Sequence, residues 1–393
     1  YAKIVNCNFT GGPTEYTTGN TAYFGIRLYL TEKINISSNQ FYPDATGGMY
    51  IQCIFSSGTN YSTIENNIAT KPYEKLCYIY GDYNLMTGNM VVGNTDTIPG
   101  TSQGGTLTSV YRANGSFNKI SNNYSYYCLA GATIMDGVGN EVSNNSFISC
   151  GQIGVAVFPS SAYTGTFNGT VIADNVITGE AIPGITNTFG ILVNLDYASS
   201  QNVQVTDNNI SYFAGNASYG VIFVAIQAPY SLTNCKISGN KTKGGSIGYN
   251  GIYLTRVIDS IISDNHIEDC INYAMVENGG AYNNWLNNKC TNIGTIGISG
   301  LSTSSFCQDN QYTRVPLVGT ATLANAITTT VTHGGVAPNA RIFLQTANDT
   351  AGVLITGKGW PTTAPSGNDF TLTMANGTAS GSTTAQFFYN IVQ

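Results

Sequence analysis

A short pattern of apolar and polar positions recurs along the first three quarters of the chain. An aliphatic residue is followed by a small polar residue, then by Asn, Asp or Gly, and then by Asn, as in 120–123 (ISNN) and 142–145 (VSNN). We take the last Asn of each block as its anchor. Successive anchors are separated by roughly 20–35 residues, a period typical of repeat architectures. The anchors are Asn8, Asn39, Asn67, Asn89, Asn123, Asn145, Asn175, Asn208, Asn240, Asn265, Asn288 and Asn310.

Each block is interpreted as the end of one strand, a tight bend and the start of the next strand. The aliphatic residue is expected to point inward, and Asn tolerates the left-handed backbone that such a bend requires. Asn side chains stacked coil on coil would then bond to their neighbours as a ladder. The short spacing from Asn67 to Asn89 corresponds to a minimal coil, and longer spacings indicate the same coil with loops inserted at one corner.

A second block predicts further strands. It begins with Gly and continues with alternating apolar residues, as in 25–28 (GIRL), 154–157 (GVAV), 190–193 (GILV) and 251–254 (GIYL). Alternation of this kind indicates a strand with one buried face. Two or three short strands per coil can pair only with adjacent coils, so the pattern predicts parallel sheets that run along a rod.

These blocks resemble the pectate-lyase-like family of right-handed parallel β-helix proteins, in which an asparagine ladder lines one turn. The resemblance covers about residues 1–315 and implies a solenoid of about 12 coils, most like viral tailspike or fibre proteins and surface β-helix proteins. It leaves the function open, because lyases, hydrolases, tailspikes and adhesins share the fold.

The residue pattern changes after Pro316. Thr- and Ala-rich alternating segments, such as 320–323 (TATL) and 370–373 (FTLT), are separated by Gly, Pro and Asn turns. We therefore predict an all-β protein with two domains, a β-helix over 1–315 and a small β-sandwich over 316–393. The second domain would cap the strand edges at the end of the solenoid or drive oligomerisation.

Composition excludes several classes of protein. Charged residues make up 9% of the chain, against roughly 25% in ordinary soluble domains, but 42% of residues are hydrophobic, which argues against disorder. The net charge is -6 and no basic run exists, so nucleic acid is not an expected partner. No apolar run is long enough to span a bilayer, so no membrane insertion is expected. Because the first repeat begins almost at Tyr1, we expect the chain to be part of a longer protein.

The nine cysteines are odd in number, which excludes a fully paired disulfide framework. Cys128 and Cys150 each follow their anchors by five residues in consecutive coils, so their Cα atoms should lie near ~5 Å apart. That spacing is compatible with a disulfide or with stacked thiols.

Three acids are candidates for the catalytic groups of a polysaccharide lyase or hydrolase: Asp136, Asp196 and Glu277. A hydrolase needs two carboxyl groups several ångströms apart. Arg112 and Asp136 lie near the ends of equivalent strands in consecutive coils, as do Arg256 and Glu277. Coils are about 4.8 Å apart, so each pair is expected to be able to touch, either as a salt bridge between coils or as part of a ligand site built on Arg112 or Arg256.

Other polar residues suggest binding or modification. Tyr80 and Tyr83 belong to a chain with 26 tyrosines and are candidates for stacking on sugars. Asn60, Asn114 and Asn168 begin glycosylation sequons in predicted loops. Asp264, His266 and Glu268 alternate along 264–268 and are interpreted as a solvated turn rather than a metal site. No metal and no cofactor are predicted.

Three functions remain open. We favour an extracellular fibre or tailspike on a virion surface that binds a cell-surface glycan or receptor, forms a homotrimer and contacts other proteins of the virion or surface structure. The alternatives are a secreted or spike-borne polysaccharide depolymerase that uses the acids above, and a cell-surface adhesin. The longest insertions, between Asn89 and Asn123 and between Asn145 and Asn240, are where binding loops are expected.

Overall fold

Parallel strands fill most of the part of the chain that the computed structural model describes. The described residues are 2–10, 24–42, 52–70, 75–93, 109–160, 162–180, 188–196, 198–213, 220–244, 250–314, 317–332, 341–348, 350–351, 354, 361–366, 369–374 and 384–392. The chain divides into two units, Tyr1–Thr313 and Arg314–Gln393. The expected insertion between Asn89 and Asn123 includes residues 94–108, which lie outside the described part.

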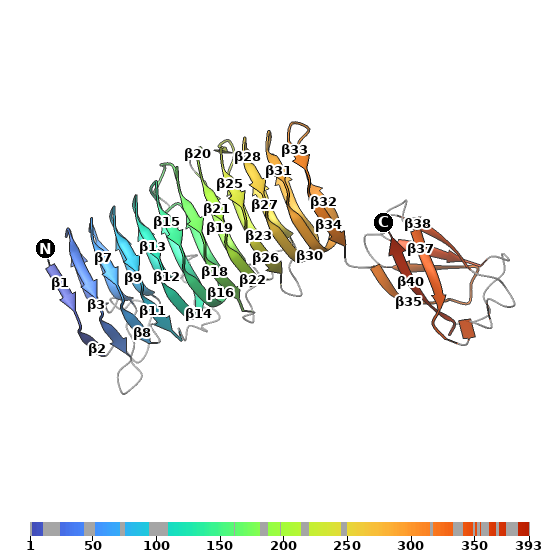
Figure 1. Ribbon diagram of the computed structural model, residues 1–393, viewed down its shortest axis with the longest axis horizontal. Coiled ribbons are helices and arrows are strands. Elements are labelled where there is room, and N and C mark those ends of the chain that lie inside the picture. The colour runs from blue at the N-terminus through green and yellow to red at the C-terminus, as the bar shows by residue number, and fades with distance from the viewer. Residues whose placement is uncertain are drawn as a thin grey trace. The chain divides into compact units, whose positions relative to one another are not determined.

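The first unit contains a parallel sheet with one short strand from each of twelve coils, here called the ladder sheet (Figure 1). This matches the predicted number of coils. Its strands, in spatial order, are β1 (Ala2–Val5), β4 (Ile34–Ser37), β7 (Thr63–Glu65), β10 (Leu85–Thr87), β13 (Lys119–Ser121), β15 (Glu141–Ser143), β17 (Val171–Ala173), β21 (Gln204–Thr206), β25 (Lys236–Ser238), β29 (Ile261–Ser263), β31 (Asn284–Leu286) and β33 (Phe306–Gln308).

The rest of each coil belongs to a nineteen-stranded parallel sheet, here called the wide sheet. A three-stranded sheet of β20 (Ser200–Gln201), β24 (Leu232–Thr233) and β28 (Val257–Ile258) lies between the two in three coils. The strands of the wide sheet are β2 (Asn8–Thr10), β3 (Phe24–Tyr29), β5 (Gln40–Tyr42), β6 (Gln52–Ser57), β8 (Ile68–Thr70), β9 (Lys75–Tyr80), β11 (Met90–Val92), β12 (Ser109–Asn114), β14 (Tyr124–Met135), β16 (Ser146–Phe158), β18 (Val176–Gly179), β19 (Phe189–Leu195), β22 (Asn209–Phe213), β23 (Gly220–Ile226), β26 (Lys241–Gly244), β27 (Asn250–Thr255), β30 (His266–Asn278), β32 (Lys289–Ser299) and β34 (Gln311–Arg314).

Coil length follows anchor spacing. In three of the coils with closely spaced anchors, those of β14, β30 and β32, one long strand crosses the wide sheet without a break. The prediction that every insertion occurs at one corner is wrong, however. In the coil of β16 the strand is unbroken, and the extra residues lie after it, between Phe158 and the start of β17.

Aliphatic side chains of the ladder sheet stack inside the solenoid as predicted. Ile36, Ile64 and Met86 are paired in register and almost fully buried. The same row continues to Trp285 and ends at Cys307. Each fully buried side chain of this size contributes about 1.5–3 kcal/mol relative to its exposed state.

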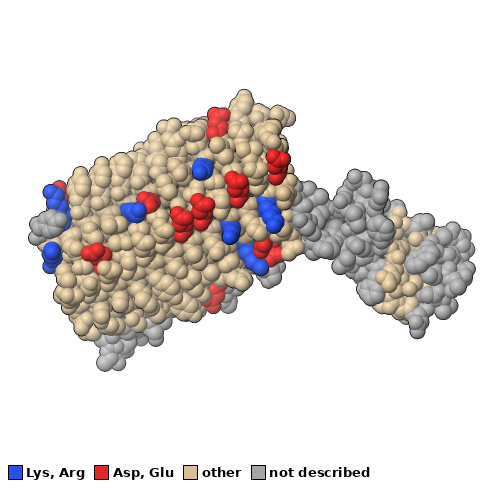
Figure 2. Space-filling view, viewed as in Figure 1, with Lys and Arg blue, Asp and Glu red and all other residues tan. Residues whose placement is uncertain are grey.

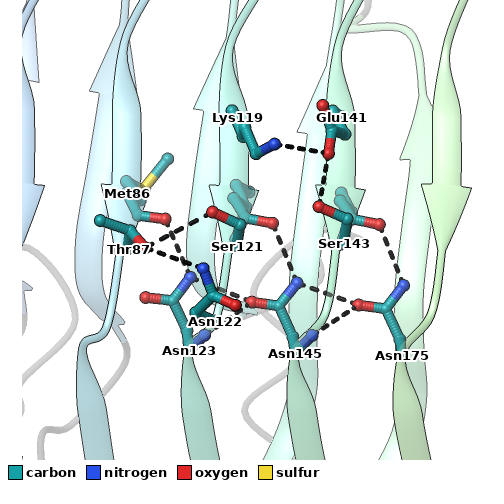
Figure 3. A network of polar contacts seen from close by, with 12 residues as sticks. Met86, Thr87, Lys119, Ser121, Asn122, Asn123, Glu141, Ser143, Asn145 and Asn175 are labelled. Carbon is teal, nitrogen blue, oxygen red and sulfur yellow. Dashed lines mark hydrogen bonds and ion pairs between the residues drawn. The ribbon is translucent and has the colours of Figure 1, made fainter.

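An asparagine ladder lines the bend that follows the ladder sheet (Figure 3). The backbone N–H of Asn123 donates to Oδ1 of Asn145 at 2.9 Å, and its Nδ2 donates to the same oxygen and to the carbonyl of Met86, both at 3.0 Å. Ten such steps join the anchors from Asn39 to Asn310. The ladder therefore satisfies backbone groups that the bend removes from the sheets.

The anchor assigned to the first coil is wrong. Val5 pairs with Ser37, so Cys7 lies opposite Asn39, and the Cys7 N–H donates to Asn39 Oδ1 at 3.0 Å. Asn8 instead lies in β2, paired with Gln40.

A second polar ladder, which the sequence reading missed, lies at the bend before the ladder sheet. The N–H of Asn84 donates to Oδ1 of Asn118 at 3.0 Å, and the N–H of Asn118 donates to Oδ1 of Asn140 at 2.9 Å. Asn283 and Ser260 continue the row farther along the solenoid. The signal was an Asn five residues before an anchor, as in Asn84 before Asn89.

The second unit consists of two three-stranded antiparallel sheets. One contains β35 (Leu317–Thr322), β40 (Gln386–Val392) and β37 (Arg341–Thr346), and the other β36 (Thr328–Thr332), β39 (Asp369–Thr373) and β38 (Thr362–Ser366). Buried residues from both sheets, including Ala321, Phe370 and Phe387, form one hydrophobic core. This arrangement is the predicted β-sandwich. In neither unit do the described residues include a helix long and apolar enough to cross a bilayer.

Candidate functional site

One outward-facing position of the wide sheet can be followed through ten coils, and we call it the outer row. Its neighbours in sequence, such as Ile26, Ile54 and Ile79, belong to the hydrophobic core inside the solenoid, so the row lies on the other face of the sheet. Strand register places one residue of each coil directly beside the next. In order, the row is Arg27, Phe55, Tyr78, Arg112, Thr133, Ala156, Leu192, Phe223, Tyr253 and Val276.

The first four coils of the outer row carry a group of rings and guanidinium groups, here called the aromatic–arginine cluster. Its rings pack on one another: Phe55 lies 4.9 Å from Phe24 and 5.7 Å from Tyr78 between centroids, and Tyr78 lies 4.7 Å from Tyr80. Tyr29 and Tyr80 are 51% and 38% exposed, so the cluster reaches the surface. The members are Phe24, Arg27, Tyr29, Phe55, Tyr78, Tyr80 and Arg112.

Both arginines of the cluster lie over rings. Arg27 Cζ is 4.8 Å from the Phe24 centroid and 4.7 Å from that of Tyr29. Arg112 Cζ is 4.4 Å from the Tyr78 centroid. Contacts of this kind contribute about 0.5–2 kcal/mol and fix the planes of the guanidinium groups.

Electrostatics at Tyr78 reflect this packing. Burial raises the pKa of Tyr78, and a hydrogen bond with Tyr80 raises it further, while the charge of Arg112 acts in the opposite direction. Tyr78 therefore stays a neutral hydroxyl at physiological pH.

Arg112 and Asp136 do not touch, although consecutive coils carry them. Arg112 pairs with Thr133, so Asp136 lies three residues farther along its strand. Asn114 links them, because Arg112 Nε donates to Asn114 Oδ1 and Asn114 Nδ2 donates to Asp136 Oδ2, both at 3.4 Å. The carboxylate of Asp136 is held mainly by Ser160, whose N–H and Oγ donate to it at 2.7 and 2.8 Å.

The two tyrosines singled out from the sequence lie in different surroundings. Tyr80 belongs to the cluster. Tyr83 lies at the bend before the ladder sheet, between the rings of Tyr61 and Phe117, with both centroid distances 4.9 Å and the planes within 11° of parallel. Both ring faces of Tyr83 are therefore covered. Phe117 in turn lies over Gly139, where a Cβ would come within 2.6 Å of its ring.

Glu277 points into the solenoid rather than to the surface. It pairs with inward-facing Leu254, is 1% exposed, and accepts hydrogen bonds from Trp285 Nε1 and Ser305 Oγ, both at 2.8 Å. Arg256 lies two residues beyond Leu254 in sequence, and among the described residues it makes no ion pair with Glu277. The predicted contact of these two residues is wrong, and Glu277 is enclosed away from any surface substrate.

The three candidate acids do not come together. Asp196 follows β19, which is two strands from β14, the strand that precedes Asp136. Two strand spacings amount to about 10 Å between backbones, near the upper end of the roughly 5–9.5 Å between the carboxyl groups of glycosidases. Burial raises the pKa of the Asp196 carboxyl, and its Oδ1 accepts no hydrogen bond from a described residue.

The sequon candidates are engaged in contacts between coils. Asn114 is 3% exposed within β12, so its prediction as a loop residue is wrong. Asn60 Oδ1 accepts the Asp82 N–H at 2.7 Å, and Asn168 Oδ1 accepts the Gln201 N–H at 2.9 Å.

The remaining candidates contact one another within their own groups. Cys128 and Cys150 are paired in register, and both are free thiols with Sγ atoms 3.4 Å apart. His266 lies 3.2 Å from Glu268, which also approaches Lys243 at 3.8 Å. No group of three metal-binding side chains occurs among the described residues.

Charges are few on the surface seen in Figure 2, where most of the described area carries neither sign. Among the described cations of the β-helix, Lys119 pairs with Glu141 at 2.8 Å in the ladder sheet (Figure 3), and Lys243 approaches Glu268 and Asp269. The arginines of the cluster form no ion pair with a described residue.

Comparison with known proteins bears on the fold. Residues 1–167 match the family described as right handed beta helix region. The surface protein and adhesin PfbA of Streptococcus pneumoniae is 13% identical over 79% of this chain and 82% of its own, with a TM-score of 0.48. A tailspike protein mutant of E. coli bacteriophage HK620, in complex with a pentasaccharide, is 12% identical over 100% of this chain and 71% of its own, also with a TM-score of 0.48.

The Dettilon tailspike protein is 11% identical over 99% of this chain and 85% of its own, with a TM-score of 0.42. No curated protein matches the sequence significantly. The stacked parallel sheets give the unit Tyr1–Thr313 the right-handed parallel β-helix fold, and the family match over residues 1–167 agrees with that fold.

Proposed function

We propose that the chain is an extracellular surface protein that binds a glycan on the aromatic–arginine cluster. The observation that carries this proposal is the cluster itself, an outward-facing group of packed rings and guanidinium groups on the wide sheet. The proposal depends on these side chains and not on the low-identity structural neighbours.

The chemistry of the cluster suits a sugar. Exposed rings such as Tyr29 and Tyr80 offer apolar faces to the C–H face of a pyranose, and their hydroxyls exchange hydrogen bonds with sugar hydroxyls. Arg27 adds donors at the same surface. Because strands of the β-helix hold every member, little ordering entropy opposes binding.

We further propose that the chain is part of a homotrimeric fibre or tailspike on a virion surface. Its low charge and its continuous ladders suit a durable rod, and the β-sandwich would cap the solenoid or mediate assembly with other surface proteins. Light scattering on the purified chain tests this part, with a stable trimer as the expected result. A clean monomer would contradict it and leave the adhesin as the remaining surface role.

A depolymerase is the second candidate, and the placement of its acids weighs against it. Asp136 is bound to Ser160, Glu277 is enclosed, and Asp196 lies about 10 Å from Asp136 along the solenoid. We therefore expect glycan binding without cleavage.

Glycan binding is tested on an oligosaccharide array, followed by calorimetry with the best ligand. Removing one stacking ring costs about 1–1.5 kcal/mol, so Tyr80→Ala and Tyr29→Ala should each weaken binding by roughly tenfold. Tyr282→Ala is the matched control, because Tyr282 is 63% exposed and lies far along the solenoid. The cluster would be excluded as the binding site if all three variants lost glycan affinity equally, or if none of them lost any.

A further inference from the structure

Arg112 is an unusual cation for a buried position. Its side chain is 6% exposed, yet among the described residues no carboxylate lies within ion-pair distance of it. Its Nε donates a hydrogen bond to Asn114 Oδ1 at 3.4 Å. The terminal nitrogens Nη1 and Nη2 have no hydrogen-bond partner among the described residues.

An unpaired buried charge is costly, so a guanidinium in this position is a candidate for an anionic ligand. Tyr78 covers one face of the group and Asn114 occupies its Nε edge, so only the terminal edge is left for a partner. Two parallel donors on that edge match the two oxygens of a planar anion.

The nearby carboxylate of Asp136 does not neutralise Arg112. Asn114 lies between the two groups, and Asp136 accepts hydrogen bonds from Asn114 Nδ2 and from the N–H and hydroxyl of Ser160. Lys243, an exposed cation of the wide sheet, does approach acids, with Glu268 and Asp269 both at 3.8 Å.

A second cation lies on the same surface. Arg27 is exposed, makes cation–π contacts with Phe24, Tyr29 and Phe55, and forms no ion pair with a described residue. Phe55 and Tyr78 lie between Arg27 and Arg112 in the outer row, so three strand spacings, about 14 Å, separate the two positions. That span fits two or three sugar units.

We propose that the aromatic–arginine cluster selects an anionic glycan, with Arg112 binding the acidic group of one sugar and Arg27 supporting the chain beyond it. This deepens the proposed function and rests on it. The shared chemistry is an anionic group on a sugar, which a carboxylate or a sulfate can supply.

The first experiment needs no variant. Wild-type affinity is measured for a carboxylated oligosaccharide, for its methyl ester, and for a sulfated oligosaccharide of equal length. Charge-assisted bonds of this kind correspond to roughly 10- to 100-fold in affinity. We expect the carboxylated or the sulfated oligosaccharide to bind more tightly than the neutral methyl ester by that factor. The acidic ligand that does so identifies the anionic group that the protein recognises.

The second experiment assigns the preference to its residue. Arg112→Gln should abolish discrimination between acid and ester while binding of the ester is retained, and Arg112→Lys should restore it in part, because Lys carries charge without the paired donors. Arg27→Gln, at an exposed position, should weaken acidic ligands by several fold. Lys236→Gln, an exposed cation of the ladder sheet, is the matched control.

The outcomes separate this inference from the function beneath it. Equal affinity for acid and ester overturns the anionic selection and leaves glycan binding intact. A preference that survives both Arg112→Gln and Arg27→Gln also overturns it. If no glycan of either class binds, both proposals are wrong. Should Arg112→Gln misfold, the ligand series and Arg27→Gln decide the question alone.

Discussion

The asparagine ladder and the outer row run along the same solenoid with the same coil-to-coil register, but they differ in how freely their residues vary. In the ladder, Asn recurs at each step from Asn39 to Asn310, because each amide must bond to the amide of the next coil. In the outer row, Arg27 and Tyr78 give way to Ala156 and Val276, since strand pairing sets the position of a residue but not its chemistry. Architecture is therefore uniform along the rod, and recognition is local.

The largest effect is expected from breaking the ladder. Asn123→Ala removes the Oδ1 that accepts two bonds from Asn89 and the Nδ2 that donates to Met86 and Asn145, in a residue 2% exposed. Leaving buried groups unsatisfied costs about 1–3 kcal/mol each, so the free energy of unfolding should fall by about 3–5 kcal/mol.

Urea unfolding followed by circular dichroism measures that change. Asn278→Ala is the control, because Asn278 is exposed on β30 and should stay within about 0.5 kcal/mol of wild type. Equal behaviour of the two variants would show that the ladder does not stabilise the solenoid.

The interior of the solenoid offers a further test, because Glu277 is an acid beside apolar Leu254 and Val224 in one inward-facing row. Glu277→Ala leaves Trp285 Nε1 and Ser305 Oγ without an acceptor, and should destabilise the chain by about 2–4 kcal/mol. Glu277→Gln keeps one acceptor oxygen and should cost less. If thermal unfolding of Glu277→Ala matched wild type, the buried network would have no structural role.

The sequence predicts the asparagine ladder better than it predicts the direction of strand side chains, and the reason is physical. The ladder repeats one residue type, so its positions are visible without knowing the strands, and it failed only at Asn8, where Cys7 occupies the step. Glu277 was misassigned because the direction of a side chain alternates along a strand. Glu277 and Leu254 each stand 11 residues before their anchors, Asn288 and Asn265, so the spacing gave their register but not which way the side chains point.

The cluster was not predicted from the sequence as a group. Arg27 and Phe55 stand 12 residues before their anchors, and Tyr78 and Arg112 stand 11 before theirs, so spacing to the anchor could have aligned them within one residue, although the distances between them vary with the insertions. Tyr80 was predicted singly, because a tyrosine near a strand end is by itself a candidate for stacking on a sugar. Tyr83 was chosen on the same ground, and only the rings of Tyr61 and Phe117 beside it show why its faces are unavailable.

A smaller effect on stability is expected at Asp136, which lies beside the cluster and accepts a hydrogen bond from Asn114. Asp136→Ala removes the two short bonds from Ser160 at a partly exposed site, and should lower the free energy of unfolding by about 1–2 kcal/mol. If Asp136 were a catalytic acid instead, Asp136→Asn would abolish cleavage of a bound polysaccharide with little change in stability. Parallel assays of unfolding and of reducing-end release distinguish these roles.

The smallest effect on stability should come from Tyr83. Its variant distinguishes the stacked rings at the bend before the ladder sheet from the rings of the aromatic–arginine cluster. Tyr83→Ala interrupts the stack of Tyr61, Tyr83 and Phe117, and loses two ring contacts on an exposed bend, which together contribute about 1 kcal/mol. Glycan affinity should remain unchanged, because stacked rings offer only their edges to a ligand. A loss of binding equal to that of Tyr80→Ala would place the sugar at the bend before the ladder sheet, and would move the binding surface from the wide sheet to that corner.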